Sequence, residues 1–510
     1  MAMMTLSEAV RDTGGRLHGA DVPIEAVQID GRRLAPGALF VAIRGDRFDG
    51  HDFIGQAAQA GAAAAMVSAQ AYDAGCANAA PGLPLAIVED TLAALGQLAS
   101  VRRRRLRGPL VAITASNGKT TIKEMTAAIL RAESALHGST PLAVAAEPAA
   151  LEAAAAASVL ATPGNLNNEI GVPLTLLSIG SAHRYAVIEM GMNHRGEIAR
   201  LTRIAQPDVA VIGNAGVAHI ENLGSREAIA SAKGEIFEGL KAGGTAVINA
   251  DDRFAASWRA LAGANRIIDF GLEHAAEVSA RWQLDATGAD LSLRTPMGEV
   301  QVRLPAPGLH NVRNALAATA AAIACGAGLD AVLHGLSAFR AVAGRLRLRP
   351  AQHGALLIDD SYNANPDSAL AAIEVLAERE GVRILVLGDM GELGVQAAQM
   401  HAEVGAAAKH FGVDRLFTVG VNSARASEAF GAGARHFDEI DPLVAEVQTL
   451  LGSQVSVLVK GSRFMRMERV VDALADLQAE LRAELRAEPR ADARVDTDGS
   501  VAGRAVSGAH

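Results

Sequence analysis

The sequence is poor in aromatic residues and nearly free of cysteine. Phe, Trp and Tyr make up 3% of its 510 residues, although half of the residues are hydrophobic. Its cores must therefore be built mainly of Ala, Leu, Val and Ile, which is typical of parallel sheets covered by Ala-rich helices. The two cysteines, Cys76 and Cys325, lie far apart and form no CxxC pair. This usage favours reduced thiols and a cytoplasmic protein.

An excess of positive charge and long apolar runs are also lacking. The formal net charge is -9, which argues against nucleic acid as a partner. We interpret one basic run, Arg102–Arg105, as a solvated helix end or linker. The N-terminus shows no signal-peptide pattern. The apolar stretches elsewhere are too short and too rich in Ala to span a bilayer, so we expect no membrane insertion.

The length and the pattern of the chain predict an α/β protein of three domains. Residues 1–107 mix short strand-like runs with helical pieces, as in a smaller N-terminal α/β domain. Residues 108–340 predict a central P-loop-type domain, with a mostly parallel sheet and helices on both faces. Residues 341–485 predict a C-terminal Rossmann-like α/β domain that ends in a helix near 465–485.

The central domain carries the clearest strand signals. Continuous apolar runs of buried parallel-strand type occur at 109–114, 185–190, 208–214 and 244–250. A more alternating stretch, 278–304, predicts antiparallel strands. Ligands of an open α/β sheet collect at the carboxyl ends of its strands, so we expect the site there.

Two segments are predicted to be peripheral. Residues 132–158 are Ala-rich and of low complexity, which predicts a surface insertion with some helix. Residues 486–510 are polar and without apolar periodicity, which predicts a disordered tail.

The stretch "ITASNGKTTIKEM" (113–125) is similar to a phosphate-binding loop with its first glycine replaced by Ile113. A strand precedes it and a helical pattern follows, as a P-loop requires. Gly118 would allow close approach of the backbone to phosphates. Lys119 would supply a positive charge, and the Thr120 hydroxyl would hold Mg²⁺. The sequence therefore predicts a nucleotide site with a shorter loop.

Three polar residues follow later strands or helices of the same domain. Glu189 ends "YAVIEM", His219 follows "IGNAGVA", and Lys233 lies in "SAKGEIF". Each is ordinary alone, as a solvated carboxylate, a structural histidine or a surface lysine. Glu189 suits a magnesium site, whereas histidine is a less usual Mg²⁺ ligand.

From about residue 25 to 475 the sequence resembles the Mur ligases, the ATP-dependent amide-bond-forming enzymes of peptidoglycan synthesis. The shorter P-loop is a feature of that whole family. The segments "DSYNANP", "GDMGELG" and "KGSR" resemble the member that adds a dipeptide. Other matching segments are "FVAIRGDRFDGHDFI", "TPGNLNNEIGVPLTLL", "IEMGMNHRGEI", "AKGEIFEGL" and "GLHNVRNALAA".

The resemblance implies a reaction and its partners. ATP would phosphorylate the C-terminal carboxylate of UDP-N-acetylmuramoyl-tripeptide, and the amine of D-alanyl-D-alanine would attack the acyl phosphate. Such a reaction needs cations that align two anionic partners and a site that excludes water. We expect two Mg²⁺ ions, no nucleic-acid partner and a monomer.

The resemblance also implies roles for single residues in the central domain. Lys119 would hold the β- and γ-phosphates, and Thr120 and Glu189 the first Mg²⁺. His219 would help to hold the second ion. Lys233 matches a lysine that family members carry as a carbamate, which turns a cation into an oxygen ligand. The remaining loop contacts to the nucleotide would come from Ser116, Asn117, Gly118 and Thr121.

Roles outside the P-loop are implied in the same way. Asn311 and Asn314 would contact adenine, Asp360 the ribose, and Arg345 the γ-phosphate from across a domain hinge. By their residue types alone, the two asparagines and the aspartate could equally cap helices. The substrate residues implied are Arg32 and Gly45 at the UDP end, and Asn365 and Ser462 in the C-terminal domain.

Three departures from the family pattern stand out. Ala115 occupies a position where glycine is usual; a positive φ there would cost about 1 kcal/mol. Gly31 stands where serine is common. The segment 132–158 is longer than the usual link and is interpreted as a tolerated surface insertion or a mobile cover.

Three alternative functions remain open from the sequence. The first is another ligase of the superfamily, which adds a single amino acid or makes folylpolyglutamate. The second is a P-loop ATPase that switches a partner interaction. The third is a degenerate structural homologue, against which the intact P-loop and strand-end residues argue.

Overall fold

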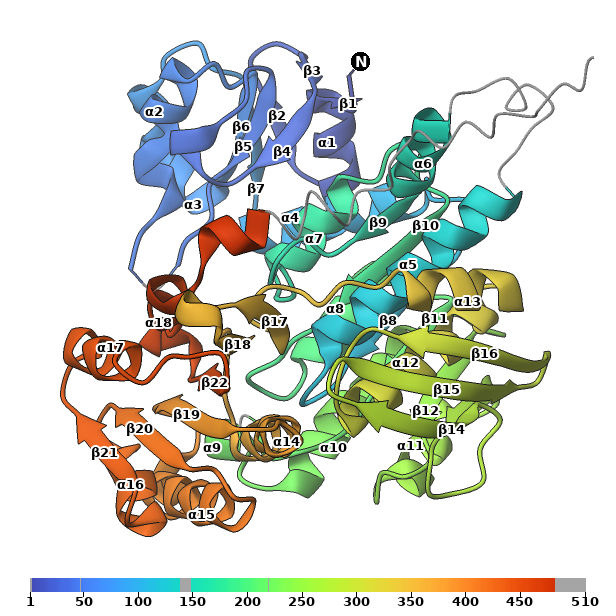
Figure 1. The fold of residues 1–510 in the computed structure, drawn as a ribbon. Helices are drawn as coiled ribbons and strands as arrows, with labels where there is room; N and C mark the ends of the chain where they lie inside the picture. Colours follow the sequence, from blue (N-terminus) through green and yellow to red (C-terminus); the bar gives the residue numbers. More distant parts are fainter. Residues whose placement is uncertain (1, 46, 138–147, 219, 482–510) are drawn as a thin grey trace, which may run out of the picture.

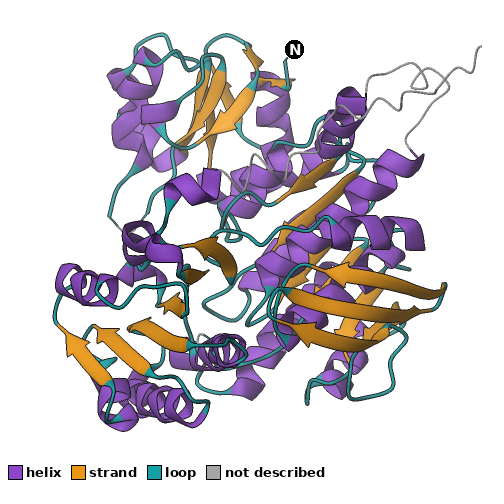
Figure 2. Ribbon diagram, in the orientation of Figure 1, coloured by secondary structure: helices purple, strands orange, loops and turns teal. Residues whose placement is uncertain are grey.

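The computed structural model describes residues 2–45, 47–137, 148–218 and 220–481. Figure 1 shows an N-terminal part at the top, a central part at the right and a C-terminal part at the lower left. Figure 2 shows that each part combines strands with covering helices. The predicted three-domain α/β fold is thereby confirmed.

The N-terminal domain contains a five-stranded sheet in the order β2-β7-β6-β5-β4. Its only antiparallel edge strand is β2, and the other strands run parallel. The strands are β2 (Arg16–His18), β4 (Ala26–Gln28), β5 (Ala38–Val41), β6 (Ala64–Ser68) and β7 (Leu85–Val88). A two-stranded pair joins β1 (Met4–Thr5) to β3 (Pro23–Ile24), and the helices are α1 (Leu6–Thr13), α2 (Ile54–Gln59), α3 (Ala69–Asp73) and α4 (Thr91–Arg103).

The central domain is built on a six-stranded sheet in which every pair of neighbours is parallel. In spatial order the strands are β13 (Arg266–Phe270), β12 (Thr245–Asn249), β11 (Val209–Ile212), β8 (Leu110–Thr114), β10 (Tyr185–Glu189) and β9 (Val159–Ala161). The four predicted parallel strands are confirmed. The edge strands β9 and β13 were not predicted, because their apolar runs are short or broken by charge.

Both faces of this sheet are buried, because successive apolar side chains of a strand point to opposite faces and join different cores. Leu110 and Ala112 of β8 join one hydrophobic core, whereas Val111 and Ile113 join the other. The first core includes residues of α4, α7 (Gly171–Leu177), α8 (Glu197–Ala205), α10 (Arg226–Gly234) and α11 (Ala255–Ala262), and it continues into the N-terminal domain. The second core includes residues of α5 (Lys119–His137), α12 (Leu309–Ala324) and α13 (Leu329–Ser337).

The alternating stretch 278–304 forms the predicted antiparallel sheet. It comprises β14 (Ser279–Asp285), β15 (Gly288–Thr295) and β16 (Gly298–Leu304). Its buried face, with Leu291 and Val302, packs into the second core of the central domain.

The C-terminal domain repeats this plan with a six-stranded sheet in the order β17-β18-β22-β19-β20-β21. Only β17 is antiparallel to its neighbour. The strands are β17 (Arg347–Pro350), β18 (Leu356–Asp360), β19 (Val382–Gly388), β20 (Arg415–Val419), β21 (Ala434–Phe437) and β22 (Val455–Lys460). One core includes α14 (Pro366–Ala377), α15 (Ala397–His410) and α16 (Ala424–Phe430), and the other includes α17 (Ile440–Gln448) and α18 (Glu468–Leu474).

The predicted single helix near 465–485 is wrong. Helix α18 ends at Leu474, and Ala475 pairs with Ala351 as an isolated β-bridge. The amide of Asp476 donates to the Pro350 carbonyl oxygen (3.0 Å), and its carboxylate accepts from the amide of Ala479 (3.0 Å). Docking against the sheet edge thus interrupts a pattern that is locally helical. The predicted tail, 486–510, lies outside the described residues.

The Ala-rich stretch 132–158 is divided between two helices. Residues 132–137 form the last part of α5, where the buried Glu133 accepts a hydrogen bond from the amide of Gly328 (3.0 Å). Helix α6 (Pro148–Ala157) precedes β9, and residues 138–147 lie outside the described part of the chain. The beginning of the stretch is therefore packed helix rather than a surface excursion.

The basic run differs from a uniformly solvated helix end. The Arg103 side chain is buried; it donates to the Ala205 carbonyl oxygen (2.9 Å) and pairs with Asp208 (2.7 Å). Arg104, in contrast, is exposed. The Asp208 carboxylate also accepts from the amide of Leu110, so Arg103 ties α4 to the start of β8. Within the described ranges, no helix has the length and apolarity that a bilayer span needs.

We predict that Arg103→Ala lowers the free energy of unfolding by about 3 kcal/mol, because buried carbonyl groups lose their donor and the carboxylate of Asp208 loses its buried cation. Urea denaturation of this variant, with Arg104→Ala as the exposed control, measures the effect. The control should stay within about 0.5 kcal/mol of the parent. Equal stabilities of the two variants would contradict the role of Arg103.

Candidate nucleotide and substrate site

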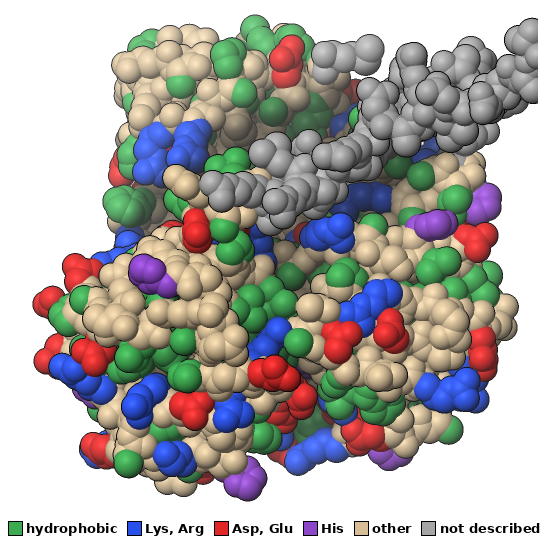
Figure 3. Space-filling view, in the orientation of Figure 1, with side chains coloured by type: hydrophobic (Ala, Val, Ile, Leu, Met, Phe, Trp, Pro, Cys, Tyr) green, Lys and Arg blue, Asp and Glu red, His purple; other side chains and the backbone are tan. Residues whose placement is uncertain are grey.

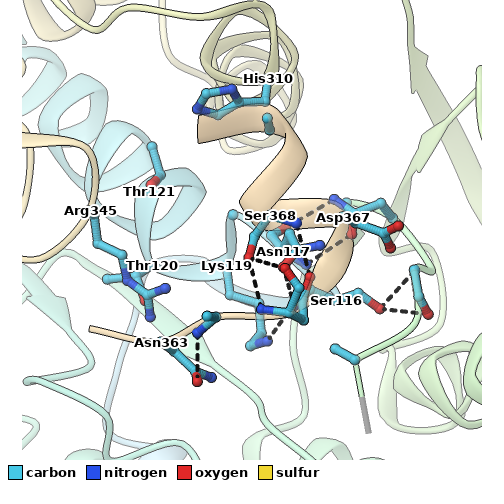
Figure 4. Close-up of a pocket in the computed structure, with 18 of the residues that line it drawn as sticks. Ser116, Asn117, Lys119, Thr120, Thr121, His310, Arg345, Asn363, Asp367 and Ser368 are labelled. Carbon is cyan, nitrogen blue, oxygen red and sulfur yellow. Dashed lines mark hydrogen bonds between the residues drawn. The ribbon is translucent and has the colours of Figure 1, made fainter. Parts of the chain in front are cut away.

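A cavity of about 780 Å³ lies between the central and C-terminal domains, at the carboxyl ends of β8 and β11. It brings together most of the predicted site residues. These are Ser116, Asn117, Gly118, Lys119, Thr120, Thr121, Asn311, Asn314, Arg345, Asp360, Asn365 and Ser462. Figure 4 shows side chains of the P-loop beside Asp367 and Ser368, at the start of α14.

The P-loop has the backbone geometry that phosphate binding requires. Strand β8 ends at Thr114, and α5 begins at Lys119, so the turn aims the first helical amides at the cavity. Gly118 adopts a positive φ of 84°, and a Cβ there would overlap the side chain of Asn314. Glycine is therefore required at this position for two independent reasons.

The alanine at the start of the loop causes no backbone strain. Ala115 does not adopt a positive φ, and its side chain is fully buried. The room for its methyl group comes from Gly213, where a Cβ would lie 2.9 Å from the Cβ of Ala115. The two residues are therefore complementary.

The ammonium group of Lys119 lies over the loop. It donates to the carbonyl oxygens of Ala115 (2.7 Å) and Ser116 (3.4 Å). Desolvation lowers the pKa of Lys119, and Arg345 acts in the same direction; Glu189 and Glu392 oppose both. An anion in the cavity would therefore be attracted by two cations, one from each domain.

Oxygen donors lie next to the P-loop. The Thr120 hydroxyl donates to Glu189 Oε2 (3.0 Å), and Asn167 Nδ2 donates to Glu189 Oε1 (2.8 Å). Glu189 is 2% exposed and is the last residue of β10, the neighbour of β8. Hydroxyl and carboxylate oxygens are the ligands that Mg²⁺ prefers. The described residues contain no group of three or more His, Cys, Asp or Glu that could hold an ion alone, and His219 lies outside them.

Lys233 is a buried lysine at the end of α10. It is 1% exposed, and among the described residues its ammonium makes no hydrogen bond or ion pair. Desolvation lowers its pKa well below the usual value, and the nearby positive charge of Lys119 lowers it further. This shift favours the neutral, nucleophilic form of the amine.

The entrance to α12 presents two asparagines and a histidine. Asn311 Nδ2 donates to the Pro307 carbonyl oxygen (2.8 Å), and Asn314 Nδ2 donates to Asn311 Oδ1 (3.2 Å). The Nε2 atom of His310 is buried without a hydrogen-bond partner, and burial lowers the pKa of this side chain to about 4. A neutral imidazole therefore lines the cavity beside the two amides.

The C-terminal domain contributes charge from its own strand ends. Lys460 forms an ion pair with the buried Asp360 and also donates to the Asn363 carbonyl oxygen (3.0 Å). Desolvation lowers the pKa of Lys460 and raises that of Asp360, while their attraction opposes both shifts. The guanidinium of Arg345 stacks 4.2 Å from the ring centroid of Tyr362. These contacts orient Asp360 and Arg345 along one wall of the cavity.

Ser462 has a structural position within the predicted substrate region. Its hydroxyl donates to the Ala364 carbonyl oxygen (3.1 Å) and accepts from the amide of Gly391 (2.8 Å). It therefore links the loops that follow β18 and β19 at the edge of the cavity.

Hydrogen bonds hold the two domains together across the cavity. Asn365 Nδ2 donates to Asn117 Oδ1 (2.7 Å), while the other atom of its amide, Oδ1, caps α14. The carboxylate of Asp367 accepts from the amide of Val217 (3.0 Å) and from Arg226 (3.2 Å). The start of α14 is thus docked against the P-loop.

The predicted UDP-end residues lie elsewhere. Arg32 and Gly45 belong to the N-terminal domain and do not line this cavity. Arg32 is largely exposed and pairs with Asp30 (2.9 Å). Gly31 is buried, and a Cβ at this position would touch Phe40, Phe53 and Gln56 at 3.9 Å. These are ordinary contacts, so sterics do not explain why glycine replaces the usual serine.

Several residues of the site were missed by the sequence analysis. They are Asn167, Asn214, Arg226, His310, Asp367 and Lys460. Four of them lie in or beside segments that carry the resemblance, "TPGNLNNE", "GLHNVRN", "DSYNANPDS" and "VKGSR". Arg226 and Asn214 had no such signal.

Comparison with known proteins gives a consistent result over most of the chain. Three family models match: the Mur ligase family catalytic domain over residues 23–103, the Mur ligase middle domain over 113–322, and the Mur ligase glutamate ligase domain over 344–463. UDP-N-acetylmuramoyl-tripeptide–D-alanyl-D-alanine ligase of Escherichia coli is 43% identical, over 93% of this chain and 99% of that protein.

Solved structures agree. A crystal structure of MurF from Acinetobacter baumannii superimposes with a TM-score of 0.79 at 34% identity, covering 92% of this chain and 98% of that one. MurF ligase from Thermotoga maritima, solved in complex with ADP, superimposes with a TM-score of 0.73 at 27% identity, covering 90% and 98%.

We predict that Asp367→Ala loosens the contact between the central and C-terminal domains. The amide of Val217 loses its acceptor, so its hydrogen exchange should become about tenfold faster. Exchange measured by mass spectrometry on peptides that contain Val217 tests this. Asp330→Ala, in the first turn of α13, is the matched control for a lost helix-start charge and should leave this exchange unchanged. Unchanged exchange in Asp367→Ala would show that the contact does not protect the loop.

Proposed function

This chain belongs to the Mur ligase family, and we propose that it catalyses ATP-dependent addition of D-alanyl-D-alanine to the C-terminal carboxylate of UDP-N-acetylmuramoyl-tripeptide. The observation that carries the proposal is the similarity of nearly the whole chain to the Escherichia coli ligase of that name. The support from geometry is the cavity between the domains, which has the P-loop on one wall and cations on the other. We propose that this synthesis of a cell-wall precursor occurs in the cytoplasm and that the protein is a monomer.

The reaction consists of two balanced steps. A carboxylate oxygen of the tripeptide attacks the γ-phosphorus of ATP, so that an acyl phosphate forms and ADP leaves. The amine of D-alanyl-D-alanine then attacks the acyl carbon, and after loss of a proton the tetrahedral intermediate expels phosphate. A phosphate leaving group makes amide formation favourable from a carboxylate, which is a poor acyl donor at neutral pH.

In the first step Lys119 would move from the loop carbonyls to the β- and γ-phosphates, and the amides at the start of α5 would face the same oxygens. Arg345 would approach the γ-phosphate from the opposite wall. Positioning and charge neutralisation account for most of the catalysis of phosphoryl transfer. Both contributions require contact between the two domains, because Lys119 belongs to the central domain and Arg345 to the C-terminal domain.

Magnesium fits the donor set beside the P-loop. Thr120 and Glu189 offer hard oxygens, and a hydrogen bond from Asn167 to Oε1 orients the carboxylate of Glu189. A bound Mg²⁺ would supply charge neutralisation on the phosphate oxygens. Because the described residues hold few ligands, phosphate oxygens would complete the coordination. We assign the predicted second ion to His219 and Lys233 as a proposal.

The remaining contacts follow from the position of each residue. Asn311 and Asn314, beside the neutral His310, would bind adenine, and Asp360 would bind the ribose. Asn365 and Ser462 lie on the C-terminal wall, where the dipeptide would enter. Arg32 and Gly45 would hold the UDP end from the N-terminal domain. The docking of α14 on the P-loop would keep water from the acyl phosphate.

A single assay distinguishes this proposal from the alternatives. We predict ADP release only when UDP-N-acetylmuramoyl-tripeptide and D-alanyl-D-alanine are both present. Single amino acids, or a folate with glutamate, should not replace them. Lys119→Ala should lose at least about 1,000-fold in rate, since it removes the cation at the transferred phosphate, yet keep its fold. Lys409→Ala, at an exposed helix end, is the control.

Each competing function has its own outcome in this assay. ADP release that is indifferent to the muramyl substrate would indicate an ATPase switch, and dependence on a single amino acid would indicate another ligase. No turnover at all would indicate a degenerate homologue. Parental turnover by Lys119→Ala would refute the P-loop assignment.

We propose that Lys233 carries a carbamate in the active protein. Its buried, unpaired amine with a lowered pKa is the form that reacts with CO₂. The amine nitrogen attacks the carbon of CO₂, and one proton is lost, which leaves an anionic carbamate. The carbamate anion would lie near the positive charge of Lys119. Attraction to Lys119 would offset the desolvation cost of the carbamate, whereas Lys119 repels the unmodified ammonium.

We predict a ¹³C NMR signal from a protein carbamate when the protein is incubated with ¹³C-labelled bicarbonate. Lys233→Gln should lack the signal, because it has no amine. Lys123→Gln is the control: Lys123 is also buried, but it donates to the Thr162 carbonyl oxygen (2.6 Å) and pairs with Glu124, so its amine is not free to react. A signal that survives in Lys233→Gln would place the carbamate on another amine.

A further inference from the structure

A second cavity, of about 1,180 Å³, lies at the junction of the N-terminal and central domains. It is formed by the start of β4, the linker between α4 and β8, and the segment from α7 to β10. The residues that matter for its chemistry are Glu25, Arg102, Arg105, Arg107, His183 and Arg184. Nothing in the proposed ligase reaction uses this cavity.

The second cavity is separate from the nucleotide site. None of the residues that the structure describes lines both cavities. The P-loop follows the carboxyl end of β8, whereas Gly108 and Pro109 line the second cavity just before the amino end of the same strand. Tyr185, the first residue of the parallel neighbour β10, lines it as well. The length of β8 therefore lies between the two cavities, about 16 Å for five residues.

Positive charge exceeds negative charge in the lining of the second cavity. Among the described residues, the side chains of Arg102, Arg107 and Arg184 make no hydrogen bond or ion pair, and Glu25 is the only carboxylate in the lining. The Nε atom of Arg102 is buried without a partner. Many arginines elsewhere in the chain are ion-paired, and Figure 3 shows acidic and basic side chains intermixed over the visible surface. The clustered arginines of the second cavity thus differ from these other arginines in having no ion pair among the described residues.

The basic run 102–105 therefore divides into different environments. Arg103 is satisfied by Asp208 and the Ala205 carbonyl oxygen, and Arg105 donates to the Met3 carbonyl oxygen (3.0 Å). Arg104 is exposed and lies outside the cavity lining. Only Arg102 directs a buried, unsatisfied donor atom to this region. Desolvation and the positive charge of Arg105 lower the pKa of Arg102.

A neutral histidine adds a further donor. His183 Nδ1 accepts from the amide of Gly180 (2.8 Å), so the proton of the neutral ring lies on Nε2. Burial and Arg102 lower the pKa of His183, which keeps the ring neutral. Guanidinium and imidazole N–H groups match the oxygens of phosphate groups in geometry and charge.

We propose that this cavity binds a small molecule that carries one or more phosphate groups. The arginines Arg102, Arg107 and Arg184 bind its phosphate oxygens. Leu174, Leu177 and the Tyr185 ring provide an apolar wall for an attached organic group. The volume is sufficient for a ligand of nucleotide size. Because its walls come from two domains, the bound molecule contacts both.

Binding is tested by calorimetry on the full chain with the Lys119→Ala substitution, which weakens phosphate binding at the P-loop. Pyrophosphate is the first probe, and ADP is the second, so that a free phosphate anion is distinguished from a nucleotide. Adding Arg102→Gln or Arg184→Ala should weaken binding about tenfold, as expected for the loss of a charge-assisted hydrogen bond. Adding Arg104→Ala should change the affinity less than twofold.

Two further variants, Arg184→Ala and Arg104→Ala, ensure that the experiment can support or overturn the proposal. Arg184 is exposed, so Arg184→Ala tests the site even if Arg102→Gln fails to fold. Binding of ADP but not of pyrophosphate, with loss in Arg184→Ala, supports a nucleotide-like ligand. No binding of either probe overturns the proposal. Equal losses in Arg104→Ala and Arg184→Ala also overturn it, because they indicate unspecific attraction to the basic run.

Discussion

In the central sheet, β8, β10, β11 and β12 run parallel, so the residues that follow these strands meet at one edge. Thr120, at the start of the helix after β8, and Glu189, at the end of β10, are hydrogen-bonded for this reason although 69 positions separate them. The same edge receives the start of α14 from the C-terminal domain. Chemistry at the P-loop therefore depends on strand direction in one domain and on the docking of another.

Three lysines around this edge give it its electrostatic character; Lys233 and Lys460 are buried, and Lys119 is half-buried. Desolvation lowers the pKa values of Lys119, Lys233 and Lys460. Lys460 is compensated by Asp360, and Lys119 by loop carbonyls that phosphate oxygens could replace. Lys233 has no such partner among the described residues, which makes it the natural position for a modification that supplies negative charge.

Strong local signals in the sequence were sufficient for much of this architecture. Apolar runs predicted the parallel strands of the central domain, and "SNGKTT" predicted the strand–loop–helix unit that the structure shows. Local signals failed where contacts with residues distant in the sequence determine the structure. The helix predicted near 465–485 breaks at Ala475 because that residue pairs with Ala351, and part of the 132–158 stretch is packed because Glu133 caps the segment at Gly328.

The sequence by itself determined the position of the P-loop, the strand periodicity and the family, since these depend on neighbouring residues and on motifs. Only the tertiary structure decided which polar residues face one another. Asn117 and Asn365 are 248 positions apart, and no local pattern marks their contact. Within the run 102–105, Arg103 is buried and Arg104 is exposed because one points into a domain junction and the other into solvent. Such contacts depend on how whole domains pack, which short-range periodicity does not encode.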